Sequence, residues 1–550
     1  MAPRPGEEKH HVYHDVQVDA QKAGLNVDEA VTARITDDML VEKSREAFRW
    51  KSKAGWRIVQ IMIVMAANQA AYGIDWGVIS SINSNDRWRN YYGFENSGHT
   101  IGIINALMSI GSFTGAPFLS LADKIGRRSV NFIGCFLTVI AAIIQAFAPN
   151  IRVLMFARWL LGFATALCTS SQYIAEVAPA HIRGNIVGVF GAFFQVGSLS
   201  IIGILMGFTK WDSDWSWRAA FLIQALFPAF VCVTIYLMCP ESPRYMVMKG
   251  QREKARDMIS KYFTASEDPN HPFVDLMMYQ IDESIENSAV GFRATWDFRI
   301  FFTRKTMFRT LILLVYSVWQ QWNGGGIIGM YIDPAMKDLG ITKQLDILGI
   351  NLGLTSTYFV FTLVGAYIIE KFRRRTLIFA GLISIICAQT AVTITGWQFD
   401  VNPTKGLSAA AVLFVFVNQV CSASFIATMH NLYPVELMSL PLRAKGMSLY
   451  TMFQGAASTV HNYGISMGIS KIGYKIWAVY ICFNFAMIGI SYLIFPETGK
   501  LSLEEIDKIF ETPNAPPVKL SVKIADAKWE SIKLEKEAIR AGRSITVNEA

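Results

Sequence analysis

Charged residues are scarce in this sequence. Asp, Glu, Lys and Arg make up 17% of the 550 residues, while hydrophobic residues make up 52%. Soluble domains carry about 25% charged residues, and about 20 consecutive apolar residues are enough to cross a bilayer. The shortage of charge therefore excludes a soluble multidomain protein and leaves too little polar chain for a large catalytic domain. We expect a multi-pass membrane protein that is not an enzyme.

Features that define several other protein classes are absent as well. The seven cysteines include no Cys-x-x-Cys pair and lie in or beside apolar segments, so we interpret them as small packing residues. The sequence contains no phosphate-binding loop, no cluster of metal-ligand residue types and no paired catalytic carboxylates in a soluble domain. Its polar first fifty residues lack the apolar core of a cleaved signal peptide. We expect no cofactor, no metal site and no removable leader.

The net charge of +8 comes from basic residues that gather in short clusters between apolar segments. Such clusters fix the orientation of membrane proteins, with basic loops in the cytoplasm, so we expect contact with the lipid bilayer and no nucleic-acid binding. With a cytoplasmic N-terminus, the inner and outer short loops hold ten Lys and Arg residues each, but the outer loops also contain many acidic residues. Both termini are therefore expected to be cytoplasmic.

Twelve apolar stretches have the length of a membrane-spanning helix. They cover 57–80, 101–121, 130–149, 153–174, 186–208, 218–239, 308–331, 346–369, 376–397, 407–431, 446–468 and 476–495. The sequence thus predicts an all-α membrane protein. The predicted domains are a cytoplasmic N-terminal segment (1–55), a six-helix bundle (56–240), cytosolic linker helices (241–307), a second six-helix bundle (308–496) and a cytoplasmic tail (497–550).

An internal repeat relates the two predicted bundles. The segment 123–128 returns at 370–375, offset by 247 residues, and Glu176 with Arg183 returns as Glu436 with Arg443, offset by 260. Pro-Glu-Ser at 240–242 returns as Pro-Glu-Thr at 496–498, offset by 256. Three ordered pairs at similar offsets indicate two homologous halves, and parallel halves of this kind form transporters with a site between them.

Each repeated motif combines carboxylates with arginines near a cytoplasmic helix end. Guanidinium groups can bind carboxylates and the carbonyls at a helix C-terminus, so we interpret the motifs as a cytoplasmic gate. Positive-inside topology alone would explain the arginines, but not the identical spacing from Glu to Arg in both halves. The predicted gate residues are Asp123, Arg127, Arg128, Glu176, Arg183, Glu241, Arg244, Glu370, Arg374, Arg375, Glu436, Arg443 and Glu497.

These motifs resemble those of the sugar porter family of the major facilitator superfamily. The resemblance spans about 57–510 and rests on Asp-x-x-Gly-Arg-Arg at 123–128, Pro-Glu-Ser-Pro-Arg at 240–244, Gln-Gln at 320–321, Tyr-Pro-Val-Glu at 433–436 and Pro-Glu-Thr-Gly at 496–499. The forms Tyr-Pro-Val-Glu and Gln-Trp-Asn-Gly look most like fungal permeases of the lactose and cellodextrin type. The resemblance implies a major facilitator fold with twelve helices in two bundles.

Asp75 is a carboxylate inside the first apolar segment, where a charge costs about 2.5–3.5 kcal/mol unless it is offset. Arg158 in the fourth segment should lie at a similar depth, because that segment runs in the opposite direction. We therefore expect a buried pair. The resemblance implies that Asp75 takes up the coupled proton and that Arg158 is its partner; a purely structural salt bridge is the alternative.

The seventh apolar segment contains Gln-Gln-Trp-Asn-Gly-Gly-Gly at 320–326. Three glycines at membrane depth predict a helix break whose freed backbone groups must bind neighbours or water. The resemblance implies that the two glutamines bind sugar hydroxyls and that Tyr331 closes an outer gate, whereas the alternative is that the amides join helices. The predicted substrate-binding residues are Gln320, Gln321, Asn323, Tyr331, Asn431, Gln454 and His461.

Two glycines stand where the resemblance would place amides, Gly191 in span five and Gly326 in span seven. Hydrogen bonds to hydroxyls demand matched partners, so we expect a pocket with more space or less polarity than a hexose site. A disaccharide or a non-sugar metabolite is then a plausible substrate.

We therefore expect a proton-coupled importer of a sugar or sugar-like solute that works by alternating access. The alternatives are a passive uniporter, a transporter of a secondary metabolite on the same scaffold, and a nutrient sensor. The expected partners are a small-molecule solute, protons and lipid. We further expect a monomer in the plasma membrane.

Overall fold

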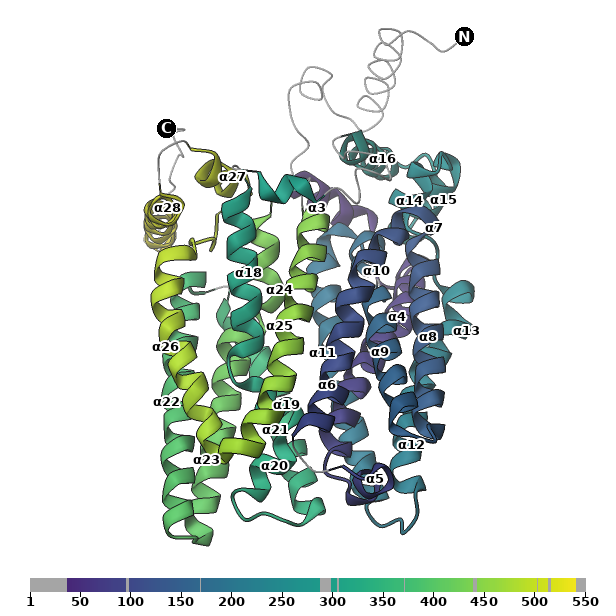
Figure 1. The fold of residues 1–550 in the computed structure, drawn as a ribbon. Helices are drawn as coiled ribbons and strands as arrows, with labels where there is room; N and C mark the ends of the chain where they lie inside the picture. The colour runs from purple at the N-terminus through teal and green to yellow at the C-terminus, as the bar shows by residue number, and fades with distance from the viewer. Residues whose placement is uncertain are drawn as a thin grey trace. The chain divides into compact units, whose positions relative to one another are not determined.

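The computed structural model describes residues 37–94, 98–168, 170–286, 298–303, 306–369, 371–438, 443–501, 503–512 and 516–540. Every regular element within these ranges is helical (Figure 1). Helices are the expected solution, because a segment in lipid must satisfy its backbone hydrogen bonds internally. The predicted all-α class is confirmed.

The long helices of the first repeat follow the six predicted apolar stretches closely. Three of the spans are interrupted or extended by a second short element, so each is given with its parts. They are α4 (Lys53–Ile82), α6 (His99–Gly115) with η1 (Ala116–Leu121), α8 (Arg127–Phe147), α9 (Ile151–Leu167) with α10 (Ser170–Val177), α11 (Arg183–Phe208), and α12 (Trp215–Gln224) with α13 (Leu226–Met238).

The second repeat contributes six more spans in the same order. They are α18 (Met307–Trp322) with α19 (Gly325–Met330), α21 (Gln344–Ile369), α22 (Arg374–Val401), α23 (Lys405–Cys421) with the π-helical turn η4 (Ser422–Ala427) and α24 (Met429–Leu437), α25 (Arg443–Ile472) and α26 (Ile476–Ile494).

Ten stretches within the described residues are long and apolar enough to cross a membrane. One of them, Lys445–Ile494, contains both α25 and α26. The interrupted pair α18 and α19 is a further span whose longest helix has only 16 residues. The described helices therefore account for the twelve predicted spans.

Short helices and the 24-residue α28 make up most of the remaining described chain. Those outside the repeats' spans are α3 (Asp37–Ala47), α5 (Asp86–Tyr92), α7 (Ala122–Ile125), η2 (Ala180–Ile182), α14 (Pro243–Met248), α15 (Arg252–Phe263), α16 (Pro272–Glu286), η3 (Arg299–Phe302), α20 (Ile332–Lys337), η6 (Gly473–Lys475), α27 (Leu503–Glu511) and α28 (Pro517–Arg540). The linker predicted over 241–307 thus contains α14, α15, α16 and η3.

The chain divides into two compact units whose limits cut across the repeats. The first unit contains 1–78, 114–201 and 218–296, and the second contains 79–113, 202–217 and 297–550. The outer end of α4, together with α5 and α6, therefore packs with the second repeat. The domain limits predicted from the sequence describe the repeats and stay a prediction.

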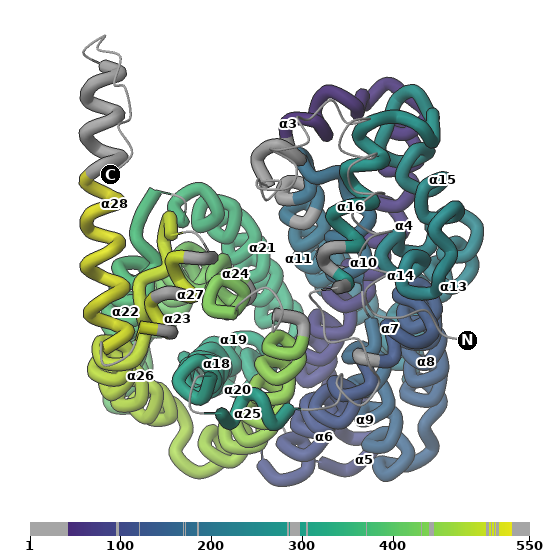
Figure 2. The backbone as a smooth tube through the Cα atoms, turned by 90° about the horizontal axis from the view of Figure 1, so that it is seen from above, coloured from purple at the N-terminus to yellow at the C-terminus, as the bar shows by residue number. Residues whose placement is uncertain are grey.

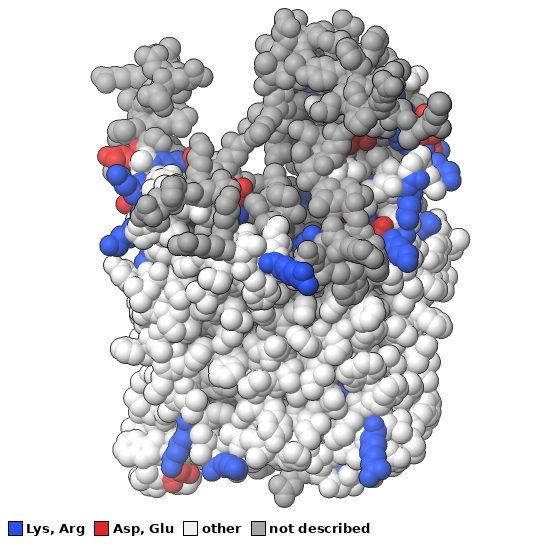
Figure 3. Space-filling view, turned by 45° about the horizontal axis from the view of Figure 1, so that its top comes forward, with Lys and Arg blue, Asp and Glu red and all other residues white. Residues whose placement is uncertain are grey.

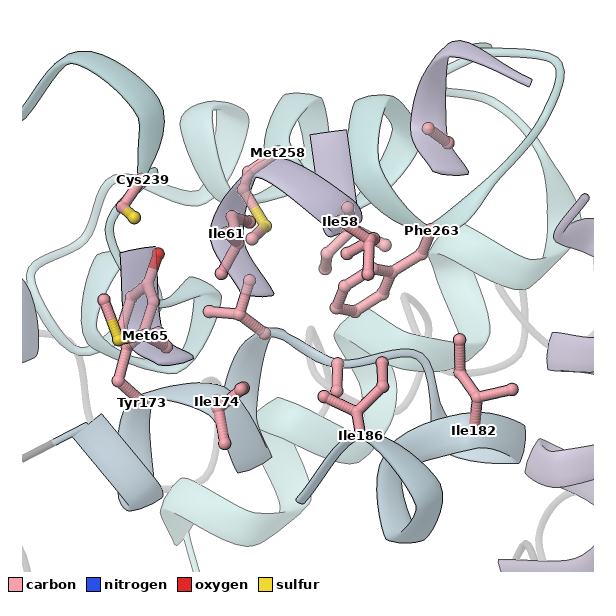
Figure 4. Close-up of a cluster of buried hydrophobic side chains, with 14 of the residues drawn as sticks. Ile58, Ile61, Met65, Tyr173, Ile174, Ile182, Ile186, Cys239, Met258 and Phe263 are labelled. Carbon is pink, nitrogen blue, oxygen red and sulfur yellow. The ribbon is translucent and has the colours of Figure 1, made fainter. Parts of the chain in front are cut away.

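The core of the first unit joins its inner helix ends to the linker helices (Figure 4). Met65 of α4 lies beside Tyr173 of α10, whereas Ile58 of α4 lies beside Phe263 of α15, and Met258 of α15 lies above Ile61. Phe263 is completely buried and Met258 is 4% exposed. Burial of each large apolar side chain contributes about 1.5–3 kcal/mol, so α15 is part of this unit's core.

The second unit is built around α18. In the view along the helices, α18 and α19 lie inside a ring formed by α21, α22, α24, α25 and α26 (Figure 2). Aromatic side chains fill the inner end of this ring: the ring centre of Tyr316 lies 5.1 Å from that of Tyr433 and 5.7 Å from that of Phe495. Tilted and edge-to-face aromatic pairs of this kind each contribute about 0.5–1.5 kcal/mol beyond the burial of their apolar area.

Charged side chains are concentrated at the two ends of the helices. Figure 3 shows a band of uncharged residues between them, with Lys, Arg, Asp and Glu at its upper and lower margins. This distribution is the one that a bilayer requires, since charges leave the hydrocarbon region for water.

Candidate functional site

Asp75 and Arg158 lie inside spans one and four of the first unit. Each residue is 1% exposed, and the two charges interact. Neither side chain has a hydrogen-bond partner among the described residues, and the Arg158 guanidinium instead lies 5.4 Å from the centre of the Phe221 ring. The two residues are therefore buried and electrostatically coupled, but they are not a hydrogen-bonded ion pair.

Glycines on either side of Asp75 bring α4 close to α11. A Cβ atom on Gly73 would lie 1.8 Å from the carbonyl oxygen of Phe194, and one on Gly77 would lie 2.5 Å from Ile201. Any larger residue would force these helices apart, so the glycines fix the position of the Asp75 backbone.

The first inner cluster is centred on Arg127 at the start of α8. Its guanidinium contacts Asp123 at 2.7 Å and Glu176 at 3.2 Å, and it donates to the carbonyl of Ala122 at 3.2 Å. Ser242 donates a further hydrogen bond to Glu176. The cluster therefore ties the inner ends of spans two, three, four and six together within one unit.

Glu241 binds the backbone at the start of the same helix. One of its carboxylate oxygens accepts from the backbone N–H of Arg128 at 3.3 Å and from that of Ser242 at 3.0 Å. Carboxylates are stabilised at helix N-termini. Gly126 makes this approach possible, because its φ is +98° and a Cβ atom there would lie 2.3 Å from Glu241.

The second inner cluster repeats this arrangement in the other unit. Arg374 contacts Glu436 at 3.1 Å, and Thr498 donates to Glu436 at 2.6 Å. Glu497 accepts from the backbone N–H groups of Arg374 and Arg375, at 3.0 and 3.1 Å. These residues occupy the positions of Arg127, Glu176, Ser242, Glu241 and Arg128 in the repeat.

The remaining predicted gate residues are placed as follows. Arg183 begins α11 and Arg244 lies in α14. Glu370 lies outside the described residues, as does the side chain of Arg443. The contacts above lie within each half, so the predicted contacts between the halves stay a prediction.

Span seven is broken where the sequence predicts it. Helix α18 ends at Trp322 and α19 begins at Gly325, with Gly324 at a φ of +97°. The Asn323 side chain caps the break: its amide nitrogen donates to the Gln320 carbonyl at 2.9 Å, and its oxygen accepts from the Gly325 N–H at 2.9 Å. The NH2 group and the oxygen of the Asn323 side chain therefore both bind backbone groups at the break. The sequence predicts instead that this side chain contacts the substrate.

Two buried amides that sequence reasoning missed bind the carbonyl freed by this break. Gln389 in span nine donates to the Asn323 carbonyl at 2.7 Å, and Asn484 in span twelve approaches it at 3.3 Å. Asn484 also donates to Gln389 at 3.1 Å. Neither side chain is exposed. Their only signal in the sequence is a single amide side chain in each of the apolar stretches 376–397 and 476–495.

Gln320 and Gln454 lie on either side of His430. His430 Nδ1 is 3.2 Å from the Gln320 oxygen, and its Nε2 is 3.1 Å from the Gln454 amide nitrogen. The Gln320 nitrogen donates to the Tyr316 hydroxyl at 2.9 Å, and the Gln454 nitrogen donates to the Tyr450 hydroxyl at 2.8 Å. The structure therefore joins two predicted substrate residues through a histidine that was not among them.

His461 occupies the space beside Gly326. A Cβ atom on Gly326 would lie 2.5 Å from the His461 ring, so the expectation that this glycine enlarges the pocket is wrong. The ring packs on Trp322 at 6.4 Å and on Tyr480 at 5.5 Å, is 5% exposed, and has no hydrogen-bond partner at Nε2 among the described residues. A Cβ atom on the other glycine, Gly191, would meet no described atom within 4 Å.

The other predicted substrate residues differ in exposure. Gln321 is partly exposed. Tyr331 is completely buried and donates to the Asn462 carbonyl in span eleven at 2.8 Å. The side chain of Asn431 lies outside the described residues. Tyr331 thus connects the outer part of span seven to span eleven.

An ion cluster around the buried Asp333, at the outer end of the second unit, was also missed. Arg89 of α5 lies 3.4 Å from Asp333 of α20 and also contacts Asp86, while Lys337 lies 3.2 Å from Asp333. Asp333 is 1% exposed and Arg89 is 7% exposed. From the sequence, these residues are expected only as charges in outer loops, because the composition of a loop does not predict which distant loop it contacts. We name Arg89, Asp86, Asp333 and Lys337 the outer cluster.

Comparison with known proteins identifies the class. Residues 61–510 match the family model described as "Sugar (and other) transporter". The chain therefore belongs to this family of membrane transporters, which is not a class of enzymes. The resemblance to sugar porters that the sequence motifs indicated is confirmed.

Curated relatives of several organisms match most of the chain. The MFS-type transporter oryC of Aspergillus oryzae is 23% identical over 83% of this chain and 86% of its own. The glucose transporter GlcP of Staphylococcus epidermidis is 26% identical over 81% and 96%. The high-affinity glucose transporter of Kluyveromyces lactis is 24% identical over 83% and 85%.

Solved structures confirm the fold. The inward-open xylose transporter XylE from E. coli matches with a TM-score of 0.68 at 18% identity, covering 82% of this chain and all of that one. The proton:xylose symporter XylE bound to 6-bromo-6-deoxy-D-glucose matches with a TM-score of 0.67 at 19% identity, over 83% and 100%. The chain thus has the major facilitator fold.

Proposed function

We propose that this protein transports a sugar or sugar-like solute across the membrane by alternating access and that it couples transport to protons. The single observation that carries the coupling is Asp75, which is buried beside Arg158 without a hydrogen-bond partner among the described residues. A carboxyl group in that position gains from binding a proton or from drawing closer to the arginine. Movement of span four against span one would then change its proton affinity.

The solute site is proposed to lie along α18 and α25. Gln320, Gln321 and Gln454 present amides there, and His461 adds a buried nitrogen that lacks a partner among the described residues. Amides bind hydroxyl groups as donors and as acceptors, which suits a neutral sugar. The relatives described as glucose transporters, and the xylose transporter with the same fold, support a saccharide.

The two inner clusters are proposed to form the cytoplasmic gate, and the outer cluster with Tyr331 the opposite one. The solute would pass when one gate opens and the other closes. We further propose that the protein works as a monomer in the plasma membrane, with a small-molecule solute and protons as its partners.

A non-sugar metabolite is the second candidate solute. The relative from Aspergillus oryzae is described only as an MFS-type transporter, without a named sugar. Passive uniport is the third candidate, and the buried Asp75 argues against it.

Uptake in cells that lack their own sugar transporters tests the proposal. The panel contains D-glucose, D-xylose, lactose, cellobiose, sorbitol and an aromatic carboxylate, each with and without a protonophore. We expect concentrative uptake of at least one saccharide or polyol that collapses with the protonophore. Uptake of the carboxylate alone would favour the metabolite transporter, and uptake insensitive to the protonophore would favour the uniporter.

A further inference from the structure

The five residues Tyr316, Gln320, His430, Gln454 and Tyr450 form one continuous hydrogen-bonded chain in the second unit, which we name the amide chain. Its links measure between 2.8 and 3.2 Å. Each end is anchored on a backbone carbonyl, which can only accept. Those two anchors determine the direction of every bond between them.

The first anchor is the Met429 carbonyl. Tyr316 donates its single hydroxyl proton to this oxygen at 2.9 Å, so the Tyr316 oxygen must accept from Gln320. The group of Gln320 that faces Tyr316 is therefore its NH2, and the group that faces His430 is its carbonyl oxygen. An oxygen needs a donor, so His430 carries a proton on Nδ1.

The second anchor is the carbonyl of His430 itself. Tyr450 donates its proton to this oxygen at 2.7 Å, so the Tyr450 oxygen must accept from the Gln454 NH2. The second hydrogen of the same NH2 points to His430 Nε2 at 3.1 Å. Two donors cannot bind each other, so Nε2 carries no proton. Both anchors assign the same state, a neutral imidazole with its proton on Nδ1.

We infer that His430 is a specificity-determining residue that orients the amides of Gln320 and Gln454 toward the solute. The inference rests on the proposed function, since it assigns a role within the same site. With both hydrogens of its NH2 used, Gln454 offers the solute its carbonyl oxygen, which has no partner among the described residues. Gln320 offers the second N–H of its amide.

This array selects a class of solute. A hydroxyl group can donate to the Gln454 oxygen and accept from the Gln320 N–H, whereas a carboxylate can only accept. A carboxylate would meet the Gln454 oxygen as a second acceptor, and the neutral His430 offers it no positive charge. The amide chain therefore favours neutral polyhydroxyl solutes over acids of the same size.

Three substitutions separate the two bonds of the imidazole. His430→Asn keeps an NH2 near the position of Nδ1 and loses the acceptor for Gln454. His430→Gln keeps an acceptor near the position of Nε2 and loses the donor to Gln320. His430→Leu loses both. His271→Asn is the matched control, because that histidine lies in the cytosolic linker and its Nδ1 accepts from the Phe273 N–H.

The experiment measures uptake of radiolabelled D-glucose and lactose, corrected for the amount of protein in the membrane, with glucuronate as competitor. Loss of one neutral hydrogen bond corresponds to about a five- to tenfold rise in KM. We expect such a rise for Asn and Gln, a larger one for Leu, a maximal rate within about twofold of wild type, and no change for the control. A general packing defect would instead lower the maximal rate.

Different results would contradict the role of His430 and the proposed transport of sugars. Uptake of either sugar with unchanged KM in the Asn and Gln variants would overturn the role of His430 and leave sugar transport intact. Competition by glucuronate equal to that by unlabelled glucose would overturn the assigned solute class. No saturable binding of either sugar by the purified wild-type protein would remove the proposed site and the inference with it. If His430→Leu fails to reach the membrane, the Asn and Gln variants decide.

Discussion

At the scale of single residues, the proposed proton coupling depends on how Asp75 is paired with Arg158. Both are buried, and their charges interact without a hydrogen bond. A tight ion pair would hold Asp75 ionised through the whole cycle, because a nearby arginine favours the charged form. In a looser pair, burial favours the neutral form of Asp75 and attraction to Arg158 favours its charged form. The balance between these two effects can change when the helices move. That balance is what proton coupling requires.

Asp75→Asn should therefore abolish accumulation against a gradient while leaving exchange of solute across the membrane. Asparagine has nearly the same volume, so stability should change by less than about 1 kcal/mol. Concentrative uptake tests the loss of accumulation, and counterflow in the same vesicles tests whether exchange remains. Protonophore-sensitive accumulation at the wild-type level in this variant would remove Asp75 from the coupling mechanism.

Sequence alone predicts these two residues because a charge in an apolar span is rare and its depth follows from helix geometry. The same reasoning could not predict Gln389 and Asn484, since a lone amide in an apolar span gives no sign of its partner. The role of His430 depends on two tyrosine hydroxyls whose direction only the fold reveals. Gly326 was misinterpreted because the residue that fills its space is 135 positions away.

We expect the docking of α3 to depend on pH through His181. Its Nδ1 lies 2.8 Å from the Ser44 hydroxyl, and its ring lies 5.4 Å from that of Phe48. Burial, with a contribution from Arg45, lowers the pKa of His181 below its ordinary value of 6.5. The undocked state then binds the proton more readily, so docking is strongest above pH 6.5 and weakens as the pH falls below it.

Hydrogen exchange along α3, corrected for the intrinsic effect of pH, should therefore become faster between pH 7.5 and 5.5. His181→Gln keeps a polar group but cannot titrate in this range, so its exchange should be independent of pH. Equal protection of α3 at both pH values in the wild type would show that His181 does not control this contact.

At the scale of elements, the break between α18 and α19 is stabilised by side chains of its own span and of spans nine and twelve. Gly324 supplies the left-handed backbone, Asn323 caps both sides, and Gln389 with Asn484 binds the exposed carbonyl. Irregular backbone at membrane depth is stable only when such partners are present. The outer segment α19 can therefore change direction without exposing an unpaired carbonyl to lipid.

Gln389→Leu should destabilise the protein by about 1–3 kcal/mol, because it leaves a buried carbonyl with only the longer bond from Asn484. The apparent melting temperature in detergent should fall accordingly, and maximal uptake should fall more than affinity does. Gln145→Leu in span three is a suitable control, since Gln145 is also completely buried but bonds only within its own helix, at 3.3 Å. Equal losses in both variants would assign Gln389 to general packing.

The outer cluster joins two elements that are far apart in the sequence, α5 and α20. Asp333 is buried between Arg89 and Lys337, and Asn83 donates to the Met330 carbonyl close by, at 2.8 Å. A buried carboxylate with two cations holds α20 in place only while those cations stay near. If the outer cluster is the outer gate, as proposed, opening it separates Asp333 from these cations.

Asp333→Asn should consequently favour opening to the outside. We expect a several-fold faster reaction of a cysteine introduced near Tyr331 with an impermeant thiol reagent, because a neutral side chain loses charge-assisted bonds of about 1.5–3 kcal/mol. Asp212→Asn is the control, since its carboxylate is largely exposed and binds Arg87 at the surface. A labelling rate unchanged in Asp333→Asn would remove the outer cluster from the gate.

At the scale of the whole molecule, the two inner clusters are equivalent but not identical. The position of Gly126 in the first repeat is taken by Arg373 in the second, which binds Asp526 and lies 5.8 Å from the Trp529 ring, both in α28. The Ser521 hydroxyl of α28 also accepts from the Glu497 backbone at 2.9 Å. The second cluster therefore carries the C-terminal helix, whereas the first is covered by α14 of the linker.

This equivalence predicts that Arg127→Ala and Arg374→Ala act in the same direction. Each arginine joins a carboxylate to the end of a neighbouring helix in its own half, and removing it should loosen the inner gate and favour the inward-open state. We expect about a tenfold faster alkylation of a cysteine placed on the inner side of span ten, equivalent to about 1.4 kcal/mol. Lys371→Ala is the matched control, since that cation contacts the exposed Tyr367. Because the two clusters share no residue, the double substitution should add the two effects; an effect no larger than either single one would mean that a single gate, not two, holds the inner side closed.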